Sequence, residues 1–334
     1  MAQETGIPET ALAWLNEGRQ VALATVVKTW GSAPRPVGSQ LVIDADMAFQ
    51  GSVSGGCVEG AVIHEAVEAL GDGTCRLLEF GVSDDTAFDV GLACGGQIEV
   101  MVEPIGIGQG PDKALIETLA AHRAARMPVI VAVNLADWSR QIIQHNQADG
   151  AQKARFHTDR SAREGDLFYG VHNPPLRLAL IGAVHIAQPL VQMAKMAGYD
   201  VVLCDPRDSF ASAQRFPGET FLDGWPDDAL AAYGLDARTA VVTLSHDPKI
   251  DTPALQTALA SQAFYIGALG SKRTHAKRIE ALENAGLSTD AIARIDGPVG
   301  LDIGAIAPAE IAVSIMAEMT ERLRRPDTRP GAVA

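Results

Sequence analysis

The pattern of apolar and polar positions predicts a mixed α+β domain in the first part of the chain. Runs rich in β-branched residues predict buried strands, and apolar residues at helical spacing predict the helices between them. The expected strands cover residues 20–29, 40–44, 74–80, 97–103, 129–135 and 140–143, and the expected helices cover residues 8–18, 58–70 and 112–123. The region from about residue 148 to 175 is polar and mixed.

The pattern changes to alternating strands and helices after the stiff joint Asn173-Pro174-Pro175. We therefore expect an N-terminal domain over residues 1–173 and a C-terminal domain over residues 174–334. Apolar runs with helical segments between them predict a Rossmann-like doubly wound parallel sheet in the second domain, so the fold class is α/β. The expected strands of this sheet cover residues 176–181, 200–205, 240–244 and 263–267.

Composition and charge narrow the function. With 334 residues, 47% apolar and 20% charged, the chain is long enough for two globular domains. The net charge of -14 argues against nucleic acid as a partner. No apolar run reaches membrane-spanning length and the N-terminus lacks a signal-peptide pattern, so we expect a cytoplasmic protein without a membrane partner. The four cysteines have neither the spacing of a zinc site nor the density of a disulfide framework.

Two glycine-rich turns contain a cysteine. The first includes Gly55-Gly56-Cys57 and leads into a predicted helix, and the second is Cys94-Gly95-Gly96. Glycines beside a thiol leave backbone N–H groups uncovered, so an anion can approach them closely. A cysteine at a helix N-terminus also favours the thiolate. These features indicate thiol or soft-ligand chemistry near an anion; alternatively, the glycines only make turns and both cysteines are buried small residues.

Arg35 lies in a loop made rigid by prolines and glycines, residues 30–38. Its guanidinium is a candidate anion clamp, because its two-pronged geometry suits phosphate, or else it is a solvated loop arginine.

Cys75 and Cys204 lie in strand-like sequence, and we interpret both as packing residues.

The second domain carries an imperfect dinucleotide fingerprint. Gly182 and Asp205 fit the tight turn and the ribose-binding acid, whereas Val184 replaces the second glycine and Ala187 the third. The branched Val184 side chain makes NAD(P) binding doubtful.

Further polar groups follow the later strands of the predicted sheet, where sites of such folds lie. Ser271, Lys272 and Arg273 open a helix and form a candidate phosphate seat. His246 is a candidate proton donor or ligand, or a partner in a structural hydrogen bond. The serines lie in no recognisable elbow or triad, which excludes a serine hydrolase.

A series of motifs occurs in one order along the chain and resembles the XdhC/CoxI family, the accessory proteins of xanthine dehydrogenase and related molybdenum hydroxylases. The resemblance covers about residues 10 to 324. The motifs are Gly31-Ser-Ala-Pro-Arg35, Gly55-Gly-Cys57-Val-Glu59, Cys94-Gly-Gly96, Gly182-Ala-Val-His185, Asp205-Pro-Arg207, Gly270-Ser-Lys-Arg273 and Gly300-Leu-Asp-Ile-Gly304.

The resemblance implies a protein that binds molybdenum cofactor, protects it during sulfuration and delivers it to apo-xanthine dehydrogenase, without being an enzyme itself. It implies a cysteine desulfurase as a second partner, and a homodimer is a further expectation. Cys57 is the candidate ligand of molybdenum, since a soft thiolate suits a soft site. The candidate cofactor-binding residues are Arg35, Ser54, Gly55, Gly56, Cys57, Glu59, Cys94, Gly95, Gly96, Gly182, His185, Asp205, Arg207, His246, Ser271, Lys272 and Arg273.

Two other functions stay open at this point. One is an NAD(P)-dependent oxidoreductase that uses the Rossmann-like domain. The other is a nucleotide-sensing regulatory protein in which Lys272 and Arg273 bind phosphate and the cysteines are inert.

Overall fold

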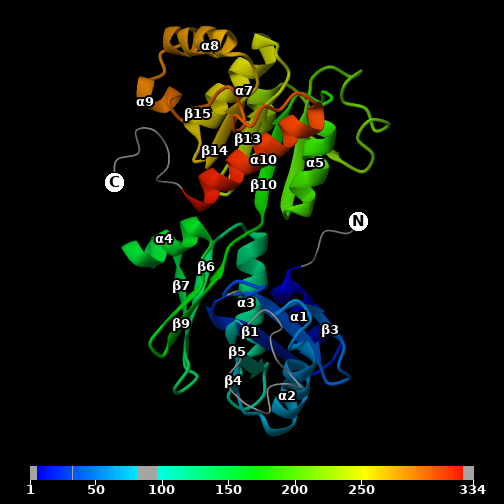
Figure 1. Ribbon diagram of the computed structural model, residues 1–334, viewed down its shortest axis with the longest axis vertical. Coiled ribbons are helices and arrows are strands. Elements are labelled where there is room, and N and C mark those ends of the chain that lie inside the picture. Colours follow the sequence, from blue (N-terminus) through cyan, green and yellow to red (C-terminus); the bar gives the residue numbers. More distant parts are fainter. Residues whose placement is uncertain (1–5, 32, 82–95, 326–334) are drawn as a thin grey trace. The chain divides into compact units, whose positions relative to one another are not determined.

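The computed structural model describes residues 6–31, 33–81 and 96–325. The chain divides into two compact units, an N-terminal unit over Met1–Pro174 and a C-terminal unit over Pro175–Ala334 (Figure 1).

The N-terminal unit is built around a five-stranded antiparallel sheet of order β3-β2-β1-β5-β4. Its strands are β1 (Val21–Trp30), β2 (Gln40–Asp44), β3 (Phe49–Gly51), β4 (Arg76–Phe80) and β5 (Gln97–Pro104), and its helices are α1 (Ile7–Asn16), α2 (Glu59–Asp72) and α3 (Lys113–Ala124). The apolar face of α2, which includes Val62, Ala66 and Leu70, packs with the inner side chains of the sheet. With the exception of the short β3, these elements were predicted from hydrophobic periodicity, within a few residues at their ends.

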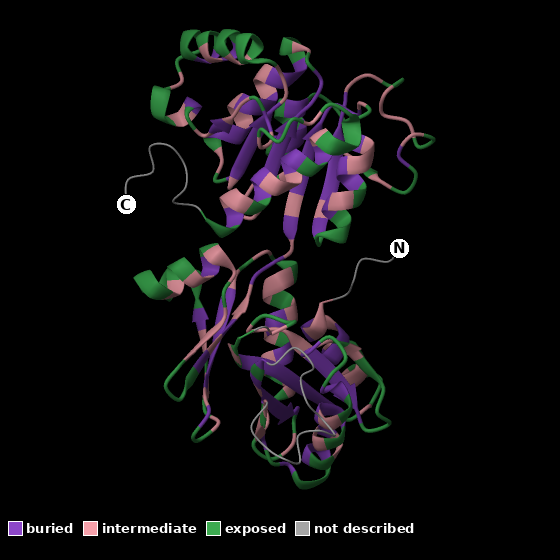
Figure 2. Ribbon diagram, in the orientation of Figure 1, coloured by how far each residue is buried: buried purple, intermediate pink, exposed green. Residues whose placement is uncertain are grey.

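A second sheet in the same unit has the order β7-β6-β9-β8. Its strands are β6 (Val129–Asn134), β7 (Arg140–Gln144), β8 (Ala162–Glu164) and β9 (Leu167–His172), and α4 (Gly150–Thr158) follows a short 3-10 turn (His145–Gln147). Val27 and Met101 of the first sheet pack against Val131 and Phe168 of the second, so the two sheets enclose a common core (Figure 2).

The region from about residue 148 to 175, which is polar and mixed in sequence, contains a helix and two strands that its pattern did not predict. Asp149 caps α4, because its side chain accepts a hydrogen bond from Gln152 N at 2.8 Å. The strands β8 and β9 pair as a tight hairpin around Gly165, whose φ is +61°.

The C-terminal unit contains a six-stranded parallel sheet of order β12-β11-β10-β13-β14-β15, which confirms the predicted Rossmann-like fold. Its strands are β10 (Leu176–Ile181), β11 (Tyr199–Cys204), β12 (Thr220–Phe221), β13 (Thr239–Thr243), β14 (Tyr265–Ala268) and β15 (Ile295–Asp296). Its helices are α5 (Ala187–Met196), α6 (Pro226–Tyr233), α7 (Pro248–Ala260), α8 (Lys272–Asn284), α9 (Thr289–Ile292) and α10 (Pro308–Arg324).

Helices cover both faces of this sheet. Leu178 and Leu180 of β10 pack into a core shared with α5 and α10, while Ala179 and Ile181 pack into a core shared with α6 and α7. This alternation explains why β10 reads as a continuous apolar run: a strand buried on both faces has no solvent side. The strand order reverses between β10 and β13, the place where ligands of such folds bind.

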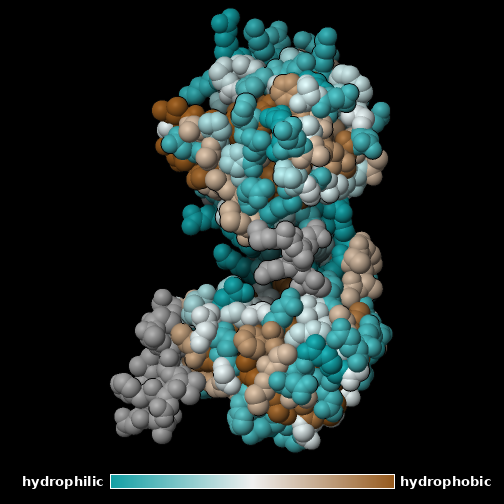
Figure 3. Space-filling model, turned by 90° about the vertical axis from the view of Figure 1, so that its right-hand side faces the viewer, coloured by the Kyte–Doolittle hydropathy of each residue, from teal (hydrophilic) through white to brown (hydrophobic). Residues whose placement is uncertain are grey.

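The surface in Figure 3 is largely hydrophilic, with apolar side chains scattered in small groups. Among the described residues, no helix combines the length and the apolar character that a membrane crossing requires.

Candidate functional site

The first glycine-cysteine motif forms the connection between β3 and α2, residues 52–58, which we call the thiol turn. Gly55 and Gly56 have φ angles of +79° and +117°, a region that favours glycine. Cys57 follows them and is exposed. The helix begins two residues later, at Glu59, so the thiol stands just before its first turn.

The two other cysteines that the structure describes differ from Cys57. Cys75 and Cys204 are buried, as their place in strand-like sequence predicted. Burial raises the pKa of both thiols to about 11. Among the described cysteines, Cys57 is therefore the one placed to react with or bind an external group.

The carboxylate of Glu59, the first residue of α2, lies at the centre of the hydrogen bonds of the thiol turn. This carboxylate is buried, with 8% of the residue exposed. It accepts hydrogen bonds from the backbone N–H groups of Val53, Ser54, Gly55 and Gly56 at 2.8 to 3.2 Å, and from the hydroxyls of Ser52 and Ser54. Burial acts to raise the pKa of Glu59, but the hydrogen bonds from Ser54 and Ser52 outweigh it and lower the pKa to about 2.

This arrangement corrects one expectation from the sequence. The glycines do bring backbone N–H groups close to an anion, but that anion is the carboxylate of Glu59. The N–H groups of Gly55 and Gly56 are therefore not uncovered, and Ser54, at 1% exposure, is buried beneath the turn.

The loop with Arg35 lies against the thiol turn. A Cβ atom placed on Gly55 would lie 3.6 Å from the Cβ of Pro34. Arg35 and Cys57 are both exposed, so a charged guanidinium and a thiol are presented from neighbouring loops.

Strand register brings Gly96, the last residue of the second motif, to the same end of the sheet as the thiol turn. Trp30, at the end of β1, pairs with Gln97 at the start of β5, so Gly96 lies beside the start of the Arg35 loop. Gly96 is buried. Cys94 and Gly95 lie outside the described residues. Within the described ranges, no three or more His, Cys, Asp or Glu side chains are grouped to hold a metal ion.

The fingerprint residues of the C-terminal unit bind one another. Gly182 has a φ of +101°, and a Cβ atom there would lie 2.7 Å from Ser245 N, so glycine lets the two strand ends approach. Asp205 accepts hydrogen bonds from Ala183 N at 2.8 Å and from Nε and Nη2 of Arg207 at 2.8 Å each. Burial acts to raise the pKa of Asp205, but the contacts with Arg207 and Ala183 N lower it.

Asp205 is thus engaged within the chain, whereas the fingerprint predicted a carboxylate directed at a ribose. The guanidinium of Arg207 also stacks 4.0 Å from the centre of the Phe210 ring. Val184, which replaces a fingerprint glycine, is partly buried and packs against the core, and His185 beside it is exposed.

The remaining predicted residues lie at the carboxyl ends of β13 and β14. His246 is exposed and has a φ of +62°, an uncommon conformation for a residue with a side chain. Ser271 caps α8, accepting a hydrogen bond from Thr274 N at 3.1 Å. Lys272 and Arg273 are exposed in the first turn of this helix.

A buried polar cluster lies beneath these loops, and sequence reasoning missed it. Ser245 donates its hydroxyl to Asp251 Oδ1 at 2.6 Å, and Arg278 Nη2 donates to Leu269 O at 2.9 Å. Asp251 Oδ2 lies 3.9 Å from Arg278 Nη2. Burial raises the pKa of Asp251. The cluster ties the β13 loop to the β14 loop, through residues too far apart in sequence to give a local signal.

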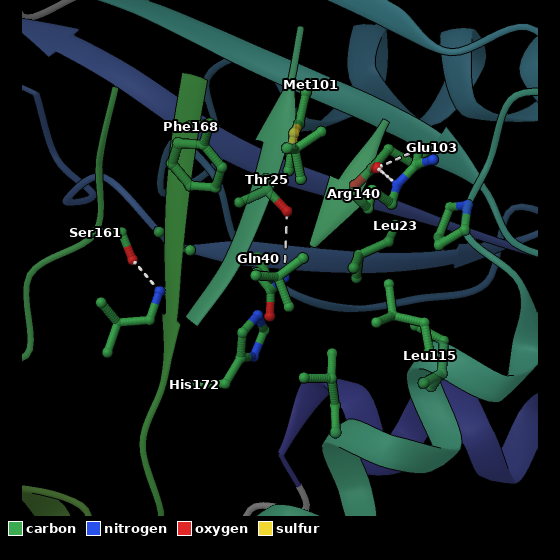
Figure 4. Close-up of a pocket in the computed structure, with 18 residues that line it drawn as sticks. Leu23, Thr25, Gln40, Met101, Glu103, Leu115, Arg140, Ser161, Phe168 and His172 are labelled. Carbon is green, nitrogen blue, oxygen red and sulfur yellow. Dashed lines mark hydrogen bonds and ion pairs between the residues drawn. The ribbon is translucent and has the colours of Figure 1, made fainter. Parts of the chain in front are cut away.

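A small cavity of about 40 Å³ lies between the two sheets of the N-terminal unit (Figure 4). Glu103 and Arg140 line it, joined by hydrogen bonds of 2.9 and 2.7 Å. Thr25 accepts a hydrogen bond from Gln40 at 3.2 Å, and the His172 ring lies near Gln40. No sequence pattern indicated these residues.

Comparison with known proteins places this pair of units in one family. Residues 14–81 match the XdhC and CoxI family, and residues 178–319 match the XdhC Rossmann domain. The Escherichia coli (strain K12) protein PaoD, a molybdenum cofactor insertion chaperone, is 30% identical over 307 residues, which span 91% of this chain and 84% of PaoD. The chain therefore belongs to the XdhC and CoxI family.

A second relative and a solved structure are also similar to this chain. A Bacillus subtilis (strain 168) protein, named as a probable subunit of xanthine dehydrogenase, is 26% identical over 328 residues, which span 94% of this chain and 96% of that protein. A solved structure from Bacillus halodurans, described as a xanthine dehydrogenase, has the same fold, with a TM-score of 0.73 and 23% identity over 98% of each chain.

Proposed function

We propose that this chain is an accessory protein that binds molybdenum cofactor, protects it while its terminal sulfur is installed, and delivers it to apo-xanthine dehydrogenase. Family membership and the name of PaoD support a role connected with molybdenum cofactor. The observation that carries the proposal is the exposed thiol of Cys57, held on a rigid turn beside the loop of Arg35.

The chemistry of the thiol turn suits this cargo. Molybdenum cofactor is a pterin dithiolene with a phosphate, so it needs a soft ligand near the metal and a cation near the phosphate. Cys57 would contact the molybdenum or its sulfur, and Arg35 would bind the phosphate with its guanidinium. Because Glu59 holds the N–H groups of the thiol turn, the phosphate would depend on side chains for its binding.

Taken by itself, the C-terminal unit presents a second group of candidate cofactor-binding residues. Lys272 and Arg273, exposed at the N-terminus of the 13-residue helix α8, supply positive charge at the carboxyl edge of the sheet. His185 and His246 are exposed at the same edge, after β10 and β13. Gly182, Asp205, Arg207 and Ser271 would shape this edge through their contacts with one another and with the backbone.

Ordinary dinucleotide binding has less support than this proposal. Asp205 is engaged with Ala183 N and Arg207, and Val184 stands where the backbone should approach a pyrophosphate. Tight NADH binding in a fluorescence titration would revive the oxidoreductase. Thermal shifts with nucleotides but none with molybdopterin would favour a nucleotide sensor.

The proposal extends to partners and location. An apo-molybdenum hydroxylase would receive the cofactor, and a cysteine desulfurase would supply the sulfur. Both exchanges belong in the reducing cytoplasm, where an exposed thiol such as Cys57 stays reduced. A homodimer remains part of the proposal.

The test measures pterin and molybdenum bound to the protein after anaerobic incubation with released molybdenum cofactor and gel filtration. The parent should retain near-stoichiometric pterin and Cys57→Ala should lose it. Cys204→Ala, which removes a buried thiol in the other unit, is the matched control and should behave like the parent. Absence of pterin on the parent would refute the carrier role, and full retention by Cys57→Ala would refute the role of the cysteine alone.

A further inference from the structure

Glu59 gathers six hydrogen bonds around one carboxylate, and the donors are almost all of the turn that precedes Cys57. A carboxylate is acceptor-only and can receive about four bonds in good geometry, so this group is at or beyond its full capacity. No lone pair of Glu59 is left to bind a cofactor. Its position two residues from Cys57 therefore calls for another explanation.

The hydrogen bonds hold the backbone on both sides of the cysteine. Before it, Gly56 N–H donates to Glu59 Oε2 at 2.8 Å. After it, Val58 N–H donates to Ser54 Oγ at 2.9 Å, and that hydroxyl in turn donates to Glu59. Cys57 is thus the exposed residue between two anchored peptide groups, both of which depend on one buried carboxylate.

We propose that Glu59 is a positioning residue that fixes the direction of the Cys57 thiol and does not itself contact the cofactor. The inference rests on the proposed role of Cys57 in binding the cofactor. The N–H groups of the thiol turn then bind an anion that the chain itself supplies, the carboxylate of Glu59. The turn therefore has its shape before any cofactor binds. Because the turn is already ordered, binding of the cofactor has a smaller cost in conformational entropy.

A side chain of the size of Glu59 is not sufficient to hold the thiol turn, because both of its oxygen atoms must accept hydrogen bonds. In Glu59→Gln, the amide oxygen can still accept from the donors that now face Oε1, which include Ser54 N and Gly55 N. The NH₂ group would then face Gly56 N–H, donor against donor. Glutamine therefore releases the N–H group of Gly56, the residue before Cys57, while it keeps most of the turn.

The first measurement needs no cofactor. Amide hydrogen exchange should show protected Gly55 and Gly56 N–H groups in the parent, although both residues are exposed. In Glu59→Gln, the protection of Gly56 should fall at least tenfold, the loss expected for a hydrogen bond to a charged group. Glu68→Gln, on the exposed side of the same helix, is the matched control and should leave the turn unchanged.

The second measurement is cofactor retention in the gel-filtration assay. Glu59→Gln should bind molybdenum cofactor at least tenfold more weakly than the parent, while the amides of α2 stay protected. If Gly56 loses protection and cofactor binding is unchanged, the positioning role is wrong. If binding is lost while Gly56 stays protected, Glu59 contacts the cofactor directly and the inference is also wrong.

A second variant covers the case in which Glu59→Gln fails to fold. Ser54→Ala leaves the carboxylate in place and removes the acceptor of Val58 N–H, on the far side of Cys57. It should lower the protection of Val58 and weaken cofactor binding several-fold; unchanged binding would overturn the inference. A parent that binds no cofactor would instead defeat the proposed function, and the exchange data would still report on the turn.

Discussion

The ion pair between Glu103 and Arg140 supports a quantitative prediction for Arg140→Met. The two side chains join β5 of one sheet to β7 of the other, and only 5% of the Glu103 side chain is exposed. Arg140 also donates to Gln109 O at 3.0 Å and to Trp138 O at 2.7 Å, beside the pair drawn in Figure 4. Methionine would fill much of the volume but supply none of these donors.

Breaking a buried pair by removing one partner leaves an uncompensated charge and costs about 3–5 kcal/mol. Glu103 cannot regain water where it lies, so we expect a loss of that size in the free energy of unfolding of the N-terminal unit. Urea unfolding followed by tryptophan fluorescence reports mainly on this unit, because Trp14, Trp30 and Trp138 belong to it and Trp225 to the other; Trp225→Phe in both proteins removes the signal of the other unit. The double variant Glu103→Leu/Arg140→Met should recover most of the loss, since it buries no charge.

The loss should also depend on pH. Burial raises the pKa of Glu103, although Arg140 opposes the rise, and the pKa would rise further without the arginine. When the pKa of a carboxyl group is higher in the folded state than in the unfolded state, the free energy of unfolding of the protein decreases as pH rises above the pKa of the unfolded state. Arg140→Met should therefore be less destabilised at pH 5 than at pH 8. A loss below about 1 kcal/mol, or one independent of pH, would show that water reaches Glu103 and would refute the reasoning.

Two further predictions concern other parts of the chain. Gly182→Ala should destabilise the C-terminal unit by about 2–4 kcal/mol, because φ is positive at this position and the added Cβ would lie 2.7 Å from Ser245 N. Thermal unfolding would measure the loss, and an unchanged melting temperature would contradict the close packing. Burial and the charge of Arg123 lower the pKa of His172 from 6.5 to about 4, so the unfolded chain binds the proton more readily and stability should fall as pH decreases from 6.5 towards 4. His172→Gln should flatten this dependence in unfolding measured at several pH values; an identical slope in both proteins would exclude His172 as its source.

Hydrophobic periodicity was sufficient to predict the elements that bury one face or both. The strand β10 is a short continuous apolar run and the helix α2 has apolar residues at helical spacing, and the structure confirms both elements. The helix α4 buries one apolar side chain, Phe156, and its pattern was therefore too weak to distinguish from a loop. The hairpin of β8 and β9 is short, and its pairing depends on β6.

The sequence was sufficient to propose where the candidate site lies along the chain, but not how its hydrogen bonds are arranged. Glycines beside Cys57 predicted a turn before a helix and left open whether the thiol is exposed or buried, and in the structure Cys57 is exposed. The sequence also contained Glu59 three residues after Gly56, the spacing at which a carboxylate reaches back to N–H groups before a helix. This spacing points to the carboxylate of Glu59, and not to an external anion, as the acceptor of these N–H groups.

The paired side chains beneath the surface could not be found in this way. Glu103 meets Arg140, and Asp251 meets Arg278, because separate elements are brought together by the fold. No local spacing relates these residues. Their pairing is a property of the assembled sheets, so only a three-dimensional structure identifies it.

The pairing of β1 with β5 has a consequence for how the protein is made. Trp30 pairs with Gln97 and Ala22 with Pro104, so the centre of the first sheet joins segments that leave the ribosome far apart in time. Closing so long a segment has an entropic cost that must be met before the contacts form, which slows the folding of such topologies. The thiol turn lies inside the closed segment. We therefore expect nascent chains to carry Cys57 for some time before β5 completes the sheet beneath it, whereas β10 and β11, separated by a single helix, can pair as soon as they emerge.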